Sequence, residues 1–390
     1  MLEPRRWQLE AREAWGKTGR GVISVVTGAG KTAFALLLFE QLRAENSALR
    51  LVVVVPTIAL LDQWWVALRT ECGLTESDIS TYSGEGHAAA PGLANILVIN
   101  TARKIAASLV GDQPCLFVVD ECHRAGSPEN ARALVTAADF TLGLSATPVR
   151  EFDDGFERYV EPALGSVVYE YDYVAALRDG IITPFDLHNF KFSMTSAETR
   201  SYEQVSRRIA RAWRDTTDPR HDSVLQRLLI QRSRISADSL HRVPAAVGVA
   251  ERFPGRRIVF HERINRADMI ASLLDRRGER VALYHSQLDS SIRRRNLELF
   301  KVGSVTTLVT CRALDEGVNV PDAQVAVIAA STRSTRQRIQ RMGRVLRRAQ
   351  DKHNAAVCTL FATDVEERQL REEGERLGEI ASTTWYEVSL

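Results

Sequence analysis

The chain has 390 residues, of which 45% are hydrophobic and 26% are charged, and its formal net charge is +2. This is the composition of a soluble globular protein of two or three domains, and so small a net charge excludes an overall basic field for nucleic acid. The longest apolar runs are only of strand length, and the N-terminal residues MLEPRRWQLEA contain no hydrophobic signal region. We therefore expect a cytoplasmic protein without a membrane partner.

The basic residues and the cysteines narrow this description. Six of the 51 basic residues are lysines and the rest are arginines, a bias for which a GC-rich genome is the simpler explanation. The five cysteines form no C-x-x-C pair and are odd in number. This pattern favours reduced thiols and argues against a zinc site.

The first third of the chain alternates short apolar runs with amphipathic stretches. Near-continuous runs of Val, Ile and Leu predict the buried strands of a parallel sheet, and the stretches between them, such as Ala33–Arg43 and Ala59–Thr70, predict helices on both faces. The expected strands are Val22–Val26, Leu51–Val55, Ile96–Ile99, Leu116–Val119 and Phe140–Leu144.

The same alternation resumes after residue 255. It predicts an α/β protein with one lobe at residues 1–190 and a second lobe, with a short helical tail, at residues 251–390. Strands are expected at Arg257–Phe260, Val281–Tyr284, Thr307–Val309, Val325–Ala329 and Ala356–Phe361, and helices at Arg266–Arg276, at Ile292–Phe300, from Arg336, and near Val365–Gly378.

Residues 191–250, between the two lobes, contain few β-branched runs and favour helices. Residues 200–242 include ten arginines and five acidic residues. These arginines are interpreted either as solvated helix faces or as nucleic-acid contacts. The sequence thus predicts a mainly helical, arginine-rich insertion or linker between the lobes.

The segment GVISVVTGAGKT, at residues 21–32, has the pattern of a phosphate-binding loop. A β-branched strand leads into Gly28-Ala29-Gly30-Lys31-Thr32 and a helix-forming run follows, which is the context in which this loop binds a nucleotide. The glycines let successive N–H groups face one anion, Lys31 can reach the β- and γ-phosphates, and the Thr32 hydroxyl can ligate Mg²⁺. Val25 stands where the full pattern has glycine. The alternative is a plain strand-to-helix turn with a surface lysine.

Two carboxylates follow the apolar run at residues 116–119. Asp120 and Glu121 stand at the C-terminal end of this expected strand, the edge of a parallel sheet at which the phosphate loop also lies. Asp120 can hold Mg²⁺ beside Thr32, and Glu121 can orient and deprotonate an attacking water. The structural alternative is a salt-bridged strand end.

These motifs, together with Leu144-Ser145-Ala146-Thr147-Pro148, resemble superfamily 2 helicases and translocases. GAGKT corresponds to motif I, Asp120-Glu121-Cys122-His123 to the DExH form of motif II, and the Ser-Ala-Thr segment to motif III. The resemblance implies two tandem RecA-like lobes with ATP and Mg²⁺ in the cleft between them. It also implies that Ser145 and Thr147, with His123, couple the nucleotide state to the grip on nucleic acid. A simpler role for Ser145 is a hydrogen bond to His123 that ties two strand ends together.

Three further segments of the first lobe resemble family motifs. Arg5-Arg6-Trp7-Gln8 is similar to the Q motif, in which Gln8 would bind the adenine edge and Trp7 or Arg5 would pack nearby. Residues 55–64 and 100–103 resemble motifs Ia and Ib, which implies that Thr57, Thr101 and Arg103 contact the phosphate backbone of nucleic acid. A threonine after a strand is also an ordinary helix N-cap.

The second lobe carries the remaining motifs. Residues 308–317 resemble motif V, in which Thr310 would contact the nucleic-acid backbone, and Gly317 and Asn319 would lie near the nucleotide. Residues 340–347, QRMGRVLR, match motif VI. This match implies that Gln340 contacts the γ-phosphate or the attacking water. It also implies that Arg344 and Arg347, on one helix face, act as arginine fingers. The alternative is a basic surface helix.

The resemblance covers about residues 4–365, and residues 142–150 and 179–184 are similar to the XPB-like and type III restriction motor (ResIII) branch. That branch mostly handles double-stranded DNA, with 3′-to-5′ movement. The resemblance therefore implies an ATP-dependent DNA helicase or translocase, with ATP and Mg²⁺ as its cofactors and duplex or single-stranded nucleic acid as its partner. Two alternatives are an RNA-remodelling ATPase and a motor subunit of a DNA repair or phage-defence complex that needs a protein partner.

Overall fold

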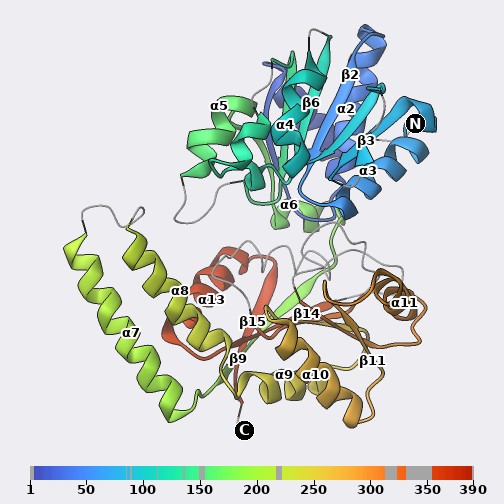
Figure 1. The fold of residues 1–390 in the computed structure, drawn as a ribbon. Coiled ribbons are helices and arrows are strands. Elements are labelled where there is room, and N and C mark those ends of the chain that lie inside the picture. Colours follow the sequence, from blue (N-terminus) through green and yellow to red (C-terminus); the bar gives the residue numbers. More distant parts are fainter. Residues whose placement is uncertain are drawn as a thin grey trace. The chain divides into compact units, whose positions relative to one another are not determined.

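In a computed structural model, residues 4–84, 86–87, 90–111, 113–134, 137–148, 154–216, 222–311, 323–330 and 354–388 are described. They form two compact units, of which the first ends at Ala176 and the second begins at Leu177. Each unit is a mainly parallel β-sheet with helices against its faces (Figure 1). The predicted α/β class, with parallel sheets flanked by helices, is confirmed. No helix in the described part of the chain combines the length and hydropathy that crossing a bilayer requires.

The sheet of the first unit has eight strands in the order β4-β3-β5-β2-β6-β7-β1-β8, and all its pairs are parallel except β3 with β4. The five strands expected from Val, Ile and Leu runs are β1, β2, β5, β6 and β7, which are almost entirely buried, as strands covered on both faces must be. The elements are β1 (Arg20–Val25), β2 (Arg50–Val55), β3 (Ile79–Ser83), β4 (Gly86–His87), β5 (Ala94–Val98), β6 (Cys115–Asp120), β7 (Phe140–Ser145), β8 (Val167–Tyr171), α1 (Arg6–Gly16), α2 (Lys31–Glu45), α3 (Ile58–Thr70), α4 (Ile99–Val110), α5 (Glu161–Leu164) and α6 (Tyr173–Arg178).

The core of the first unit holds the ends of three strands together. On one face of the sheet, Val22 of β1, Val54 of β2 and Phe117 of β6 pack in one buried cluster with α4 and α5. A side chain of this size contributes about 1.5–3 kcal/mol when it is fully buried. Strand β7 lies between β6 and β1. Motifs I, II and III begin at the C-terminal ends of β1, β6 and β7. These ends therefore lie next to one another at one edge of the sheet.

The sheet of the second unit has seven parallel strands in the order β11-β12-β10-β13-β14-β9-β15. Apolar residues of α9 and α10, such as Val247 and Ile270, pack with Val259 and Val327 of the sheet in one core. The elements are β9 (Phe185–Phe192), β10 (Arg257–Phe260), β11 (Val281–Tyr284), β12 (Thr307–Thr310), β13 (Val325–Ile328), β14 (Ala355–Phe361), β15 (Ala381–Val388), α7 (Ser196–Asp215), α8 (Ser223–Ala237), α9 (Arg242–Arg252), α10 (Ile264–Arg276), α11 (Ser290–Lys301) and α13 (Asp364–Leu377).

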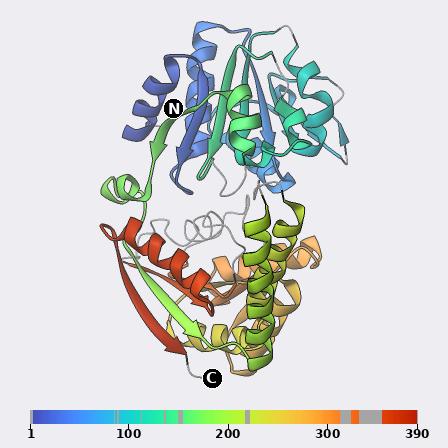
Figure 2. The same ribbon diagram turned by 90° about the vertical axis from the view of Figure 1, so that its left-hand side faces the viewer.

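The boundary between the units differs from the expected one. Strand β9, which straddles the expected end of the first lobe at residue 190, pairs with β14 and β15 in the second sheet. Helix α9 begins in the expected linker at residues 191–250, ends two residues beyond it, and packs in the second core. Helices α7 and α8 lie side by side (Figure 2) and share a small core of their own. The expected helical insertion therefore corresponds to this α7–α8 pair, and its flanking residues belong to the second unit.

Candidate active site in the first unit

The loop between β1 and α2 has the geometry of a phosphate-binding turn. Gly28 and Gly30 have φ angles of 90° and 97°, which L side chains rarely adopt, so both positions require glycine. Gly30 is the N-cap of α2, and the helix begins at Lys31. The first-turn N–H groups of a helix have no partner within it and lie at its positive end. Residues 28–32 therefore form the turn and the helix start of the strand–turn–helix unit that binds a phosphate group.

Lys31 and Glu121 form an ion pair that joins this loop to the end of β6. Lys31 Nζ lies 3.0 Å from Glu121 Oε1, and the two side chains are 11% and 14% exposed. Glu121 has φ 50° and ψ 49°, and it is the one non-glycine residue with positive φ in the described part of the chain. A left-handed conformation of this kind costs about 1–3 kcal/mol and concentrates at functional sites. Motifs I and II are therefore in contact through this ion pair. The salt-bridged strand end, which was the structural alternative for Asp120 and Glu121, is present as well.

Asp120, the last residue of β6, is 4% exposed and is held at both carboxylate oxygens. Its Oδ1 accepts the Glu121 N–H at 2.9 Å, and its Oδ2 accepts the indole N–H of Trp64 at 2.9 Å. Burial raises the pKa of Asp120, the neighbouring Glu121 charge raises it further, and Lys31 and the Trp64 hydrogen bond oppose both effects. A cation beside this carboxylate would stabilise its ionised form.

Mg²⁺ fits the donor atoms present here. The Thr32 side chain is half-buried in the first turn of α2, and each oxygen of Asp120 has a second lone pair. In the described ranges, no three His, Cys, Asp or Glu side chains gather into a metal site of their own. Mg²⁺ at nucleotide sites takes one or two protein oxygens and completes its shell with phosphate oxygens and water. Thr32 and Asp120 would therefore suffice as protein ligands.

A polar chain continues from Glu121 to motif III. His123 Nδ1 lies 3.4 Å from Glu121 Oε2 and 3.0 Å from Ser145 Oγ. Ser145 Oγ in turn accepts the Thr147 N–H at 3.1 Å. The expected hydrogen bond between Ser145 and His123 is therefore present, and it links the ends of β6 and β7. Lys31, Glu121, His123, Ser145 and Thr147 form one connected series.

The N-terminal segment supports the phosphate loop. Arg5 Nη1 and Trp7 Nε1 both donate to the Ala29 carbonyl, at 2.8 and 3.2 Å, and Gln8 Nε2 donates to the Gly30 carbonyl at 3.3 Å. Gln8 is 4% exposed. Trp7 is 1% exposed and stacks on Tyr171, so its ring packs in the core, and its packing near an adenine stays a prediction. Of the two side chains expected beside the adenine, Arg5 is the exposed one.

The predicted nucleic-acid contacts of the first unit have structural roles as well. Thr57 is the N-cap of α3, and its Oγ1 accepts the Leu60 N–H at 3.3 Å. Thr101 is buried at 8% exposure in the first turn of α4. Arg103, on the same helix, pairs with Glu129 at 2.7 Å. Contact of these three residues with nucleic acid stays a prediction.

In the second unit, Thr310 at the end of β12 is fully buried, and its hydroxyl donates to the Tyr284 carbonyl at 2.9 Å. Its side chain is therefore engaged within the sheet, and contact with nucleic acid stays a prediction. Five other predicted residues of this unit lie outside the described residues: Gly317, Asn319, Gln340, Arg344 and Arg347.

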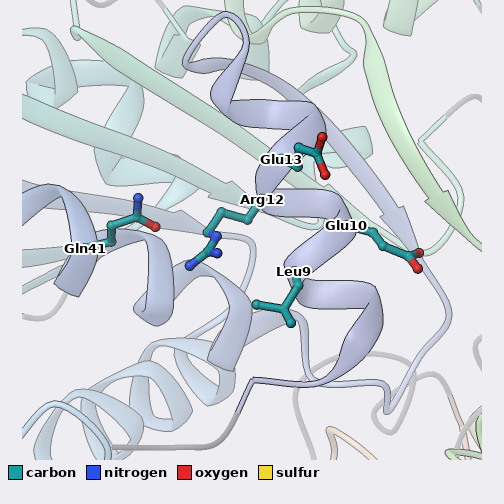
Figure 3. A pocket seen from close by; sticks show the side chains of 5 residues that line it. All are labelled: Leu9, Glu10, Arg12, Glu13 and Gln41. Atoms are coloured by element: carbon teal, nitrogen blue, oxygen red, sulfur yellow. The ribbon is translucent and has the colours of Figure 1, made fainter.

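A shallow depression between α1 and α2 is lined by Leu9, Glu10, Arg12, Glu13 and Gln41 (Figure 3). It shares no lining residue with the cluster around Lys31 and Glu121. Its side chains are of mixed charge and lie mostly on the outer face of α1, so we assign it no role.

Known proteins resemble this chain in sequence over most of its length. Residues 1–150 match the family described as "Type III restriction enzyme, res subunit", and residues 239–349 match "Helicase conserved C-terminal domain". The "DNA 3'-5' translocase XPB2" of Sulfurisphaera tokodaii is 27% identical over 375 residues, which are 89% of this chain and 79% of that protein. The "DNA 3'-5' helicase XPB" of Kineococcus radiotolerans is 26% identical over 377 residues, 93% of this chain and 60% of that protein.

Solved structures share the fold at low identity. They include the type ISP restriction-modification enzyme LlaBIII bound to DNA (TM-score 0.66, 15% identity, 100% of this chain and 31% of that chain). They also include S. cerevisiae Dbp5 bound to RNA and ADP BeF3 (TM-score 0.63, 14% identity, 98% and 90% of the two chains). These likenesses confirm that the two units are tandem RecA-like lobes. In sequence, the chain is therefore similar to DNA 3'-5' helicases and translocases named XPB over about nine tenths of its length, and to the type III restriction family over residues 1–150.

Proposed function

We propose that this protein is an ATP-dependent DNA translocase or helicase whose hydrolytic site contains Lys31, Asp120 and Glu121. The ion pair between Lys31 and Glu121 carries the proposal, because it brings the lysine of motif I and the carboxylate of motif II within hydrogen-bond distance. The relatives named for 3′-to-5′ movement on DNA support DNA over RNA as the track and favour the same direction.

The residues of the site have separable tasks in this proposal. The N–H groups after Gly28 and Gly30 would bind phosphate oxygens, and Lys31 would leave Glu121 for the more highly charged β- and γ-phosphates. Glu121, released from the lysine, would orient the attacking water and accept its proton. Mg²⁺ held by Thr32 and Asp120 would neutralise the charge that develops on the phosphate oxygens.

The remaining predicted residues would complete the nucleotide site. Arg344 and Arg347 would stabilise the transferred phosphoryl group, a task worth about 10³–10⁵ in rate, and Gln340 would contact the γ-phosphate or the water. Gly317 and Asn319 would lie near the nucleotide. Because His123 contacts both Glu121 and Ser145, a change at Glu121 reaches motif III directly, which supports the coupling role of that series.

Glu121→Gln tests the proposal at the residue that it depends on most. The amide has nearly the same shape but cannot accept the proton from water, so ATP binding is retained and steady-state hydrolysis is abolished. Binding is measured with a fluorescent ATP analogue, and hydrolysis as phosphate release in the presence of duplex DNA. Glu76→Gln removes a surface carboxylate that lies 3.6 Å from Arg69 and serves as the control with normal turnover. Near-normal turnover in Glu121→Gln would contradict the assignment.

A further inference from the structure

Trp64 fixes the orientation of the Asp120 carboxylate from outside the strand that bears it. Its indole is fully buried, and Nε1 donates to Asp120 Oδ2 at 2.9 Å. The other carboxylate oxygen accepts the Glu121 N–H at 2.9 Å. Because the carboxylate is buried and has one donor on each oxygen, it cannot turn without leaving a buried polar atom unpaired.

The other buried indoles of the first unit have different partners. Trp7 Nε1 donates to the Ala29 carbonyl, and Trp15 Nε1 donates to the Thr141 carbonyl at 2.9 Å. Trp64 instead donates to an acidic side chain, and hydrogen bonds to charged groups are shorter and stronger than those between neutral groups. Packing alone would need the ring of Trp64 but not this N–H.

Trp64 also belongs to a helix that begins at the same sheet edge as the site. Helix α3 follows β2, and β2 is the neighbour of β6 in the sheet. Its N-cap is Thr57, a predicted contact with nucleic acid, and Trp64 lies about two helical turns further along. Helix α3 therefore carries a predicted nucleic-acid contact at its start and the hydrogen bond to Asp120 in its middle.

We propose that Trp64 is a positioning residue that orients Asp120 for Mg²⁺ and links the metal site to DNA bound at the start of α3. The proposal rests on the proposed function in taking Asp120 as a Mg²⁺ ligand. A shift of α3 on DNA would move the indole, and the carboxylate would have to turn with it to keep the hydrogen bond at Oδ2, against the Glu121 N–H that holds Oδ1. Such coupling is reciprocal. DNA therefore raises the affinity for Mg²⁺ and nucleotide by the same factor by which Mg²⁺ and nucleotide raise the affinity for DNA.

Trp64→Phe tests this role, because it keeps most of the ring and deletes the N–H. The affinity for a fluorescent ADP is measured over a Mg²⁺ titration and again in EDTA, so that no turnover is needed. In Trp64→Phe, we expect the Mg²⁺ concentration that gives half of the maximal increase in ADP affinity to rise about 10–100-fold. This is the usual effect of losing a hydrogen bond to a metal ligand. The affinity in EDTA stays at the wild-type value, which shows an intact phosphate loop. Trp65→Phe is the matched control. Trp65 is the next residue of α3, and its ring packs against Arg69.

Several outcomes overturn the role. One is a wild-type Mg²⁺ dependence in Trp64→Phe, and another is an equal loss of ADP affinity with and without Mg²⁺, which would indicate packing alone. If Trp64→Phe is unstable, Trp64→His and Trp64→Leu are compared instead. Trp64→His keeps a ring N–H and should retain more of the Mg²⁺ dependence of ADP affinity than Trp64→Leu. An equal Mg²⁺ dependence in the two variants overturns the proposal. A wild-type chain without DNA-stimulated hydrolysis would instead refute the proposed function, whereas the ADP titration still decides what Trp64 does.

Discussion

Three features meet at Glu121, a carboxylate whose side chain is only 14% exposed. Its backbone is left-handed, its Oε1 pairs with Lys31, and its Oε2 lies 3.4 Å from His123. Lys31 and Glu121 neutralise each other in a largely buried site, so neither is left as an unpaired buried charge. In the proposed mechanism, an incoming triphosphate would compete for Lys31 and thereby release Glu121. This exchange would keep the general base inactive until the nucleotide arrives.

Thr57 offers a test that separates a helix cap from a phosphate contact. Asp and Asn are both good N-caps, so Thr57→Asp and Thr57→Asn keep α3 stable to within about 0.5–1 kcal/mol. A carboxylate that faces a DNA phosphate is repelled, whereas the neutral amide is not. We expect Thr57→Asp to bind duplex DNA at least tenfold more weakly than Thr57→Asn, as measured by fluorescence anisotropy at one salt concentration. Equal affinities would leave Thr57 with its capping role alone.

The residues of the site could be predicted to different depths. Lys31, Asp120 and Glu121 follow strands whose parallel order brings their ends to one edge, so their proximity follows from the pattern. The hydrogen bond from Trp64 does not, because it depends on how α3 lies over the sheet and on one rotamer of a buried ring. An indole buried two turns into a helix reads in the sequence as core packing.

Among the elements, the α7–α8 pair presents its arginines on a defined face. Arg200, Arg207, Arg211 and Arg214 are spaced by nearly whole helical turns and are all exposed. Val205 and Ile209 lie on the opposite side of α7, in the small core shared with α8. These four arginines, the arginine stripe of α7, fit either a solvated face or a contact with phosphates, the two interpretations that the sequence left open.

The salt dependence of DNA binding distinguishes these two interpretations. Each phosphate contact adds about 0.9 to the slope of log affinity against log salt. If the stripe contacts DNA, replacing Arg207, Arg211 and Arg214 with Ala lowers that slope by up to about 3. The control replaces three exposed arginines on other helices with Ala: Arg276, Arg368 and Arg376. An unchanged slope in the stripe variant would return α7 to the solvated-face interpretation.

Five strands, β3, β4, β8, β9 and β15, were not predicted, and for two of them the sequence shows the reason. In β9, FDLHNFKF, polar residues alternate with Phe and Leu, and β15, ASTTWYEV, is an edge strand with a mixed pattern. Strands of this kind lack the continuous Val, Ile and Leu runs that marked the others. The missed pairing of β9 with β14 also misplaced the boundary, because sheet partners distant in the chain leave no local signal. The helices α10, α11 and α13 begin and end within two residues of their expected bounds.

At the scale of the whole molecule, a buried arginine fastens the second unit. Arg242 is 1% exposed and donates to the Ala329 carbonyl, which follows β13, to the Leu360 carbonyl of β14, and to Glu366 of α13. Burial would raise the pKa of Glu366, but the Arg242 charge and the hydrogen bonds from the Ala362 N–H and Ser236 outweigh it, so the pKa is lowered. The pair therefore contributes to stability when Glu366 is ionised.

This contribution sets the direction of a pH effect. A depressed carboxyl pKa stabilises the fold above the unfolded value, which is about 4.3 for Glu, and the stabilisation is lost as pH falls through the folded pKa. Glu366→Gln should lower the free energy of unfolding at pH 7 by about 2–3 kcal/mol, less than for a fully buried pair because Glu366 is 28% exposed. It should also flatten the loss of stability below about pH 5. Urea unfolding at a series of pH values measures both, with the exposed Glu372→Gln as the control. An unchanged acid limb would contradict the account.

The central claim is that DNA drives hydrolysis at the Lys31–Glu121 site. The most direct measurement is the ATPase rate of the intact chain with duplex DNA, single-stranded DNA, RNA or no nucleic acid, with Glu121→Gln run in parallel. The account predicts the strongest stimulation by DNA, with duplex DNA favoured, and loss of all stimulated hydrolysis in Glu121→Gln. Stimulation by RNA above that by DNA, or a rate that no nucleic acid changes, would contradict it.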